Sequence, residues 1–350
     1  MNFKKSINKY RGKVMHSLTN HIGGDGNGID PDSISDLQVK RVLISRPNSR
    51  LGNQLLITPL VQEISNLFPN CKIDLFVRGN IAPILFENYE NVDRIIKLPK
   101  KPFKELVKYM QVWTSLRKYK YDIVINATES SSSGRISTKI AHSKIKLFND
   151  VDENLKSRYK DYMHMAKSPV YNLRKDLAAL GLKGVEDQNM PFLDIKLSED
   201  EKRKGKEVLD SIVPNNKKTI CIYTFATGDK CYPPSWWELF YSRLKAEYED
   251  RYNILEVLPA ENVSQINFKA TFYYSRNLRE MAALIGETAI FITGDCGVMH
   301  LASAAHTPTV GFFSVSNMKR YEPYNKGSIG INTNDTDIDG IMKEIGKILN

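Results

Sequence analysis

Apolar and polar positions alternate in a regular order along the chain from Lys40 onward. In the first half, short apolar runs separated by amphipathic stretches predict strands followed by helices. The strands are expected at residues 41–45, 72–77, 94–98 and 123–126, and the helices at 54–67, 81–86 and 103–116. Strands that alternate with helices favour a parallel sheet covered by helices on both faces.

The same order returns in the second half of the chain. Strands are expected at residues 219–223, 252–257, 288–293 and 309–313, and helices at 235–248, 278–285, 298–305 and 338–349. The polar residues 198–206 and 214–218 are interpreted as the segment that separates the halves. The predicted fold class is therefore α/β, with two Rossmann-like, doubly wound parallel-sheet domains.

This pattern divides the chain into four parts. We expect a basic N-terminal helix and a flexible linker at residues 1–39, a first domain at 40–197 and a second domain at 198–335. Residues 336–350 are expected to form a C-terminal helix that crosses back to the first domain.

Residues 288–310, TAIFITGDCGVMHLASAAHTPTV, carry the strongest functional signal. The tight turn places Asp295, Cys296 and Gly297 before the predicted helix, with His300 one turn inside it. A helix N-terminus attracts phosphate through its N–H groups and its dipole. Ligands of open α/β sheets bind at the carboxyl ends of the strands, so this turn is a candidate anion site. A buried structural histidine is the alternative interpretation of His300.

Two further loops are expected at the same edge of the second sheet. The loop after strand 219–223 contains Thr227, Gly228 and Lys230, which suit a diphosphate cradle; a solvated lysine is the alternative. Glu261 follows strand 252–257 and is a candidate for holding ribose hydroxyls, with a plain surface acid as the alternative.

The loop after the first predicted strand reads RPNSRLGNQ at residues 46–54. Gly52 permits a close backbone approach, and Asn53 suits the N-cap of the following helix. Arg46 and Arg50 favour a ligand-facing loop over an ordinary capped connection. The loop is not GxGxxG, which argues against a dinucleotide-binding dehydrogenase.

Composition narrows the class of protein. The chain has 350 residues, of which 41% are hydrophobic and 26% charged, as in a soluble globular protein. No apolar run approaches the ~20 residues of a membrane span. The four cysteines lack CxxC spacing and are expected to be reduced thiols in the cytosol. Residues 150–152 and 335–339 superficially resemble a DxD metal motif and are interpreted as solvated turns, so no metal site is predicted.

The net charge of +10 is partly concentrated at the N-terminus. Residues 1–20 carry five basic residues, no acid and apolar positions at helical spacing. They are interpreted either as an amphipathic helix on an anionic membrane surface or as a solvated tail. No signal-peptide core is expected there, which favours a cytoplasmic protein, peripheral on the inner face of the cytoplasmic membrane. Nucleic acid is not an expected partner, because recognition motifs and interleaved aromatic residues are lacking.

Taken together, these motifs resemble glycosyltransferase family 9, the bacterial ADP-heptose:lipopolysaccharide heptosyltransferases, over residues 40–350. The residues that carry the resemblance are Leu51-Gly52-Asn53 with Thr58-Pro59, the loop ending at Lys230 with Trp236 after it, Ala260-Glu261, and the run GDCGVMHLASA from Gly294.

The resemblance implies a GT-B fold, with a first domain for the acceptor and a second for the nucleotide sugar, facing across a cleft. It also implies inversion at the anomeric carbon and no obligatory metal or other cofactor. Lys230, with Thr227, would contact phosphate, and Glu261 would contact the nucleoside ribose. Asp295, Cys296, Gly297 and His300 would surround the diphosphate-sugar. Arg46, Arg50 and Gly52 would face the acceptor.

One residue departs from the family pattern. The family has Asp directly after the Gly of the first loop, as the proposed catalytic base, and this chain has Asn53. An amide cannot take up a proton at neutral pH. Either another carboxylate serves, for which Glu129 after strand 123–126 is the candidate, or the chain is a nucleotide-sugar-binding pseudoenzyme. The sequence thus predicts an inverting transferase that moves a heptose-like sugar to a lipid-linked glycan such as the lipopolysaccharide core, with the pseudoenzyme as the alternative.

Overall fold

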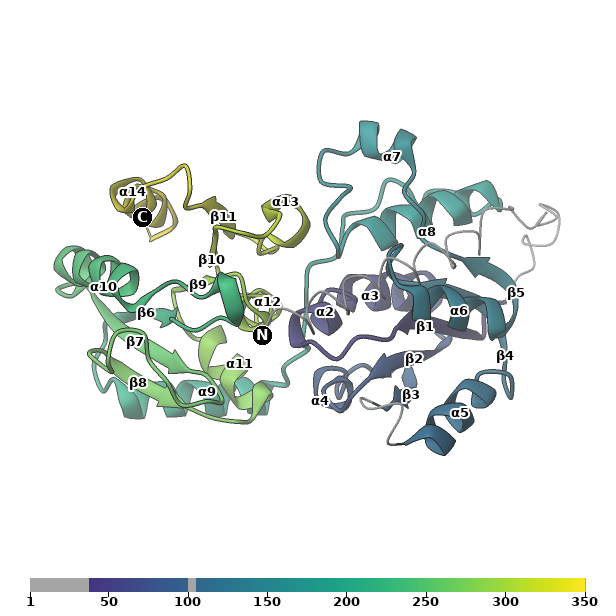
Figure 1. Cartoon of the computed structure of the whole chain (residues 1–350), viewed down its shortest axis with the longest axis horizontal. Helices are drawn as coiled ribbons and strands as arrows, with labels where there is room; N and C mark the ends of the chain where they lie inside the picture. The colour runs from purple at the N-terminus through teal and green to yellow at the C-terminus, as the bar shows by residue number, and fades with distance from the viewer. Residues whose placement is uncertain (1–37, 100–104, 350) are drawn as a thin grey trace. The chain divides into compact units, whose positions relative to one another are not determined.

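The computed structural model describes residues 38–99 and 105–349, which divide into two compact units (Figure 1). The first unit contains the described residues of 38–49, 59–83 and 89–191. The second contains 50–58, 84–88 and 192–349. The second unit therefore includes two short segments from the first half of the chain. The predicted helix at residues 1–20 lies outside the described residues.

The first unit is built on a five-stranded parallel sheet in the order β3-β2-β1-β4-β5. Its strands are β1 (Arg41–Arg46), β2 (Lys72–Arg78), β3 (Val92–Leu98), β4 (Lys120–Asn126) and β5 (His142–Leu147). Its helices are α3 (Thr58–Leu67), α4 (Ala82–Leu85), α5 (Leu106–Ser115), α6 (Ser132–Ile140), α7 (Glu153–Arg158) and α8 (Ser168–Ala179), of which α3 and α4 run on into residues of the second unit. Leu43, Phe76 and Val124 from three neighbouring strands form part of its core, which explains the apolar runs in the sequence.

The second unit is built on a six-stranded parallel sheet in the order β11-β10-β9-β6-β7-β8. Its strands are β6 (Lys218–Tyr223), β7 (Tyr252–Leu258), β8 (Thr271–Tyr274), β9 (Ile290–Gly294), β10 (Thr309–Phe313) and β11 (Ile329–Asn332). Its helices are α2 (Leu51–Leu55), α9 (Glu199–Ile212), α10 (Pro234–Tyr248), α11 (Leu278–Gly286), α12 (Gly297–Ala304), α13 (Met318–Tyr321) and α14 (Ile338–Leu349). Read in chain order, the strands follow the doubly wound Rossmann arrangement, so the predicted fold class is confirmed for each unit.

The polar residues 198–206 do not separate the two halves, and this prediction is wrong. They open α9, whose N-cap Ser198 accepts a hydrogen bond from the Glu201 N–H while the Glu201 carboxylate accepts one from the Ser198 N–H. This reciprocal pair is a capping box, and the sequence Ser-x-x-Glu announces it. The division between the units falls instead near residue 192.

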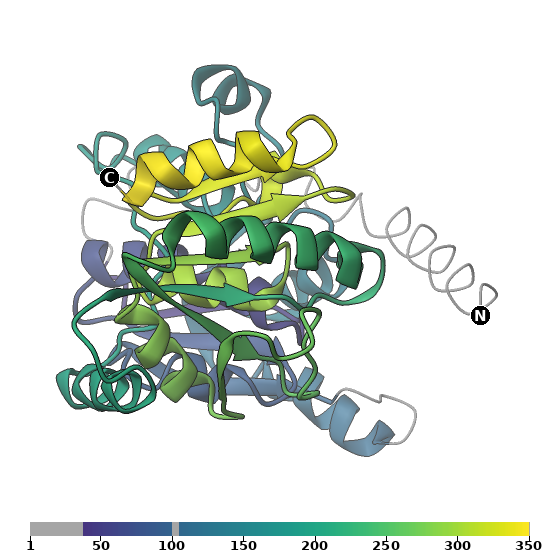
Figure 2. The same ribbon diagram turned by 90° about the vertical axis from the view of Figure 1, so that its left-hand side faces the viewer.

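The prediction that the C-terminal helix crosses back to the first domain is also wrong. Ile341, Met342 and Ile345 of α14 are buried in the core of the second unit, together with Trp237 and Phe240 of α10. Figure 2 shows α10 and α14 side by side. The apolar face of α14 thus completes the second unit rather than crossing back to the first.

Other elements also differ from the prediction. The expected helix 54–67 is divided into α2 and α3, and the pattern predicts neither strands β5, β8 and β11 nor helices α7, α8 and α13. None of the helices that the structure describes combines the length and the apolar character needed to span a lipid bilayer.

Candidate active site

The topological switch point of the second sheet lies between β6 and β9, which are neighbours although far apart in sequence. Chain connections leave these two strands in opposite directions, which opens a crevice at their carboxyl ends. The loop after β6 carries Thr227 and Lys230, and the turn after β9 carries Asp295. The structure therefore brings these two predicted loops to one place.

Lys230 and Asp295 are joined directly. The Lys230 ammonium forms an ion pair with Oδ2 of Asp295, whose side chain is only 7% exposed, while that of Lys230 is 37% exposed. The ammonium also lies 5.8 Å from the ring centre of Tyr321. The buried carboxylate thus fixes a partly exposed cation at the switch point, where it remains accessible to an anion.

The N-terminus of α12 begins beside this ion pair. Cys296 occupies the N-cap position, and the first turn of α12 contains no acidic residue. Burial raises the pKa of the Cys296 thiol, which faces Oγ1 of Thr293 at 3.5 Å. A neutral thiol does not cancel the positive end of the helix dipole. Lys230 and the start of α12 together therefore favour a negatively charged ligand.

Gly52 and His300 meet where α2 packs on α12. A β-carbon on Gly52 would lie 2.6 Å from Cδ2 of His300, and one on Gly297 would lie 3.1 Å from Cβ of Leu51. The close approach predicted at Gly52 is therefore made by a helix of the same unit. His300 is buried, which favours the structural alternative for its side chain; its donor contact stays a prediction.

Glu261 and Thr227 lie on exposed loops beyond the carboxyl ends of β7 and β6. Tyr223, the last residue of β6, links Glu261 to the turn after β9. The pKa of Tyr223 is raised above its ordinary value by burial first, and electrostatic interaction with Glu261 acts in the same direction. Glu261 therefore lies within electrostatic range of the crevice, and its contact with ribose stays a prediction.

A buried carboxylate that the sequence analysis missed holds these loops in place. Glu256 of β7 accepts hydrogen bonds from the hydroxyls of Thr224 (2.6 Å) and Ser264 (2.7 Å). Thr224 begins the Lys230 loop, and Ser264 closes the Glu261 loop. The burial of Glu256 raises the pKa of its carboxyl group, and the two hydroxyls oppose that shift. The sequence does contain a signal for this buried carboxylate, because Glu256 is an acid in the middle of the apolar strand sequence NILEVL.

The first sheet has its own switch point between β1 and β4. Arg46, at the end of β1, is buried and donates a hydrogen bond to Oγ1 of Thr128 beyond β4. Glu129 follows directly and is half-buried. Arg46 and the candidate base Glu129 therefore lie at the carboxyl edge of the same sheet.

The other residues predicted for the acceptor and the base lie in the second unit. Arg50 is exposed immediately before α2, and Asn53 is half-buried within α2. The expected N-cap role of Asn53 is wrong, because Arg50 occupies the N-cap position and Asn53 is helical. The roles of these residues toward an acceptor stay predictions.

The acidic pairs that resemble DxD have structural partners. Asp152 caps α7 by accepting a hydrogen bond from the Leu155 N–H at 2.9 Å. This hydrogen bond lowers the pKa of the Asp152 carboxyl group. Asp150 forms an ion pair with Arg135. Asp337 accepts a hydrogen bond from the Gly340 N–H at the start of α14. Within residues 38–99 and 105–349, no group of three His, Cys, Asp or Glu side chains is placed to hold a metal ion.

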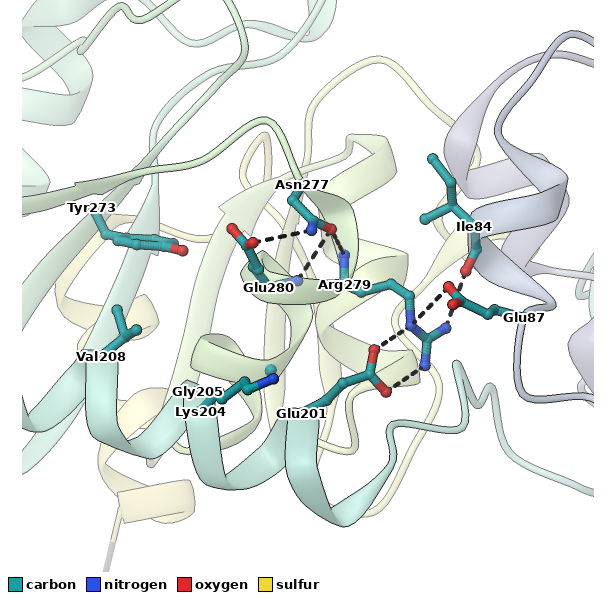
Figure 3. A pocket seen from close by; sticks show the side chains of 11 residues that line it. Ile84, Glu87, Glu201, Lys204, Gly205, Val208, Tyr273, Asn277, Arg279 and Glu280 are labelled. Atoms are coloured by element: carbon teal, nitrogen blue, oxygen red, sulfur yellow. Dashed lines mark hydrogen bonds and ion pairs between the residues drawn. The ribbon is translucent and has the colours of Figure 1, made fainter.

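A cavity of about 500 Å³ lies elsewhere in the second unit, between α9, α11 and residues 84–87 (Figure 3). Its buried cation, Arg279, donates to Oε2 of Glu201 at 2.8 Å and to the carbonyl of Ile84 at 3.0 Å. None of the predicted site residues lines this cavity. Arg279 thus serves to join α11, α9 and residues 84–87, and the predicted donor site lies elsewhere in the unit.

The protein is an α/β protein with two Rossmann-like sheets. The second sheet has a cation and a helix N-terminus at its switch point, and this arrangement suits a nucleotide diphosphate. The family model of glycosyltransferase family 9 (heptosyltransferase) matches residues 109–338, and the chain belongs to this family. It is therefore a glycosyltransferase with the two-domain GT-B architecture.

Individual relatives agree with this assignment. The chain is 22% identical over 296 residues to lipopolysaccharide heptosyltransferase 3 of Escherichia coli, covering 79% of this chain and 85% of the relative. It resembles the crystal structure of a family 9 glycosyltransferase from Veillonella parvula, with a TM-score of 0.69, 18% identity, and coverage of 89% of this chain and 99% of the other. For the E. coli ADP-heptose lps heptosyltransferase II, the TM-score is 0.61, the identity 16% and the coverage 89% and 98%.

Proposed function

We propose that this enzyme transfers a heptose-like sugar from a nucleotide-diphosphate donor to a lipopolysaccharide core or related lipid-linked glycan, with inversion at the anomeric carbon. The observation that carries the proposal is the Lys230–Asp295 ion pair at the switch point of the second sheet, beside the start of α12. The names of the heptosyltransferase relatives support the sugar and the acceptor, and one of them supports ADP as the nucleotide.

The donor side of the reaction follows from the charge at this site. As the glycosidic bond to the diphosphate breaks, negative charge grows on the departing oxygen. The Lys230 ammonium and the N–H groups at Gly297 stabilise that charge more strongly in the transition state than in the bound donor. Glu261 accepts hydrogen bonds from the ribose hydroxyls. No metal ion or other cofactor is assigned a role.

The acceptor side requires a base. The acceptor hydroxyl attacks the anomeric carbon from the face opposite to the diphosphate and loses its proton. Asn53 can orient the hydroxyl but cannot accept that proton. We assign the proton to the Glu129 carboxylate, because Glu129 is half-buried beside Arg46 at the switch point of the first sheet. The exposed Arg50 would meet acidic groups on the acceptor, whereas the buried Arg46 would hold the loop that carries Glu129 through its hydrogen bond to Thr128.

The second candidate function is a pseudoenzyme that binds the nucleotide sugar without transferring it. Asn53 in place of the family Asp is the observation that favours this alternative. Calorimetric titration with ADP, UDP and GDP, followed by an assay of sugar transfer to lipopolysaccharide core, tests both. Binding with transfer supports the enzyme, and binding without transfer under any donor and acceptor supports the pseudoenzyme.

The remaining proposal concerns the membrane. Residues 1–20, with five basic side chains and no acid, would attach the protein to the anionic inner face of the cytoplasmic membrane. If neutralising these five charges leaves binding to anionic vesicles unchanged, the segment is only a solvated extension.

A further inference from the structure

The turn that follows β5 carries a carboxylate fixed by a buried cation. Asp150 lies three residues beyond the end of β5, and its side chain is 51% exposed. The Arg135 guanidinium of α6, only 3% exposed, forms an ion pair with Oδ1 of Asp150 and donates a longer hydrogen bond to Oδ2 at 3.4 Å. Because the guanidinium is buried, it holds the half-exposed carboxylate in one orientation.

Two further buried side chains hold the backbone of the same turn. The Asn172 amide of α8 donates to the side-chain oxygen of Asn149 and, at 3.0 Å, to the carbonyl of Asp150. The Tyr162 hydroxyl donates to Oδ1 of Asn172 at 2.8 Å. Asn149 has a φ of 56°, in the left-handed region that asparagine tolerates. Buried polar side chains from separate segments therefore fix both the turn and its carboxylate.

This turn lies beside the loop of the candidate base Glu129. Strands β4 and β5 are paired in parallel, so both loops leave the carboxyl edge of the first sheet (Figure 1). The side-chain amide of Asn126, at the end of β4, donates to the carbonyls of Thr128 at 2.6 Å and Phe148 at 3.0 Å. Glu129 follows Thr128 directly, and Asp150 follows Phe148 by two residues. One amide nitrogen thus ties the two loops together.

The electrostatics of Tyr162 lead to the same placement. Burial raises the pKa of the Tyr162 hydroxyl above its ordinary value, and the charges of Asp152 and Glu129 act in the same direction. The Tyr162 oxygen also lies 3.4 Å from the carbonyl oxygen of Asp150. Glu129 and the Asp150 turn therefore belong to one region of the first unit.

The chemistry of the Asp150 carboxylate limits what it can bind. An ionised carboxylate offers about four lone-pair positions, and the contacts with Arg135 use two of them. The exposed part of the group can accept hydrogen bonds from a ligand. A phosphate group would be repelled by the charges of Asp150 and Glu129, whereas the hydroxyls of a neutral sugar are donors without charge.

We propose that Asp150 binds the acceptor by accepting hydrogen bonds from the hydroxyls of a neutral sugar ring, next to the hydroxyl that is attacked. Arg135 and Asn172 are positioning residues for this carboxylate. The assignment rests on the proposed function, because it takes the acceptor to be a glycan. It deepens that function by requiring free hydroxyls, and no phosphate substituent, on the sugar that lies at the β5 turn.

The test compares Asp150→Asn with the parent protein and uses the lipid-free inner-core oligosaccharide of lipopolysaccharide as acceptor. The amide keeps an oxygen for Arg135 but loses the charge and one acceptor atom. Calorimetric binding of the oligosaccharide should weaken about tenfold, as expected for one lost charged hydrogen bond. The acceptor KM should rise to the same extent, and kcat should fall far less than the KM rises. ADP affinity and Tm should not change.

The matched control is Asp93→Asn. Asp93 also pairs with an arginine, Arg41, at 2.8 Å, and its side chain is 32% exposed. These two residues stand at the amino ends of β3 and β1, at the opposite edge of the same sheet. The control variant should bind the oligosaccharide as the parent does.

Monodeoxy forms of the oligosaccharide give a second measurement that does not depend on the folding of a variant. The form that lacks the hydroxyl bound by Asp150 should bind the parent about tenfold more weakly than the complete acceptor does. It should bind the parent and Asp150→Asn equally, because the same hydrogen bond is absent in both complexes.

Three results would overturn the assignment. They are equal acceptor affinity of the parent and Asp150→Asn, equal weakening by Asp93→Asn, and a loss in Asp150→Asn that stays the same for every monodeoxy acceptor. Weaker acceptor binding in Asp150→Asn, without sugar transfer by any of the proteins, would support Asp150 as a glycan-binding residue and contradict only the proposed transfer.

Discussion

The two units share the Rossmann strand order but carry different side chains at their switch points. In the second unit, a partly exposed lysine is fixed by a buried aspartate beside a helix N-terminus. In the first unit, Arg46 is itself buried and donates to Thr128, and the accessible group is the half-buried carboxylate of Glu129. The second switch point thus offers positive charge and the first offers a carboxylate.

This difference shows how two units of one fold can provide the two kinds of group that a transfer reaction requires. A nucleotide diphosphate requires an anion-binding site, whereas an acceptor hydroxyl requires a group that takes up its proton. The carboxyl edge of one fold can provide either kind of group, because the residues that follow the strands are free to vary. The predictions below remove one of these features at a time.

The largest effect is expected at Glu129. Glu129→Gln should lower the transfer rate by about 10²- to 10⁴-fold, the usual contribution of a general base, with donor affinity unchanged. Steady-state kinetics and calorimetry measure the two quantities. Glu153→Gln, at an exposed acid of the same unit that pairs with Lys156, is the control. Full activity in Glu129→Gln would show that the base lies elsewhere.

The next effect is expected at Lys230. Lys230→Ala should weaken donor binding by about 1–3 kcal/mol, because a charged hydrogen bond is lost and the Asp295 carboxylate then faces the diphosphate alone. Lys230→Ala/Asp295→Asn should recover part of that loss. Lys269→Ala, which breaks an exposed ion pair with Glu238 in the same unit, should leave the affinity unchanged. An unchanged affinity in Lys230→Ala contradicts the donor site.

A change of packing is expected at Gly52. Gly52→Ala places a β-carbon 2.6 Å from His300, which must separate α2 from α12. The expected loss of unfolding free energy is about 1–3 kcal/mol, the usual cost of overpacking. Gly346→Ala in α14 is the control, since its nearest atom would be the Tyr248 hydroxyl at 3.4 Å. Urea unfolding measures both, and equal stability of the two variants would refute the close packing.

The smallest effect is expected at Glu256, and it depends on pH. Burial raises the folded-state pKa of this carboxyl above its ordinary value of 4.5. Its contribution to stability is therefore fully present below pH 4.5 and falls as the pH rises toward the folded-state pKa. Glu256→Gln should remove that slope.

At neutral pH the net cost of Glu256→Gln should be about 1 kcal/mol. Thr224 accepts a hydrogen bond from the Gln265 N–H and Ser264 accepts one from the Phe268 N–H, so both hydroxyl protons are directed toward residue 256. An amide N–H cannot accept either of them. Unfolding measured between pH 4 and 8 gives the result, and an identical slope in both proteins would exclude Glu256 as its source.

Much of this architecture could be predicted from the sequence. Apolar runs such as residues 309–313 predict buried parallel strands, and the GDCG turn predicts the start of α12, because these signals are local. Polar composition alone suggests a linker at residues 198–206, whereas the capping box of Ser198 and Glu201 identifies the start of a helix there. The C-terminal helix was misplaced because an amphipathic pattern states that one face is buried but not which sheet buries it.

The candidate site was predictable only in part for the same reason. Lys230 and Asp295 follow strands whose carboxyl ends share one edge, so topology alone brings them together. The pairing of Gly52 with His300 depends on the docking of two helices that are far apart in sequence. The role of Glu256 depends on two hydroxyls from different loops, and no local pattern reveals it.

The central claim is that this glycosyltransferase transfers sugar although Asn53 replaces the family base. The most direct measurement is mass spectrometry of a lipopolysaccharide core acceptor incubated with ADP-heptose and the full chain, with parallel detection of ADP. The account predicts one added heptose for each ADP released, and release only when acceptor is present. Tight ADP-heptose binding without any modified acceptor, together with transfer that appears only in Asn53→Asp, would contradict it and establish the pseudoenzyme.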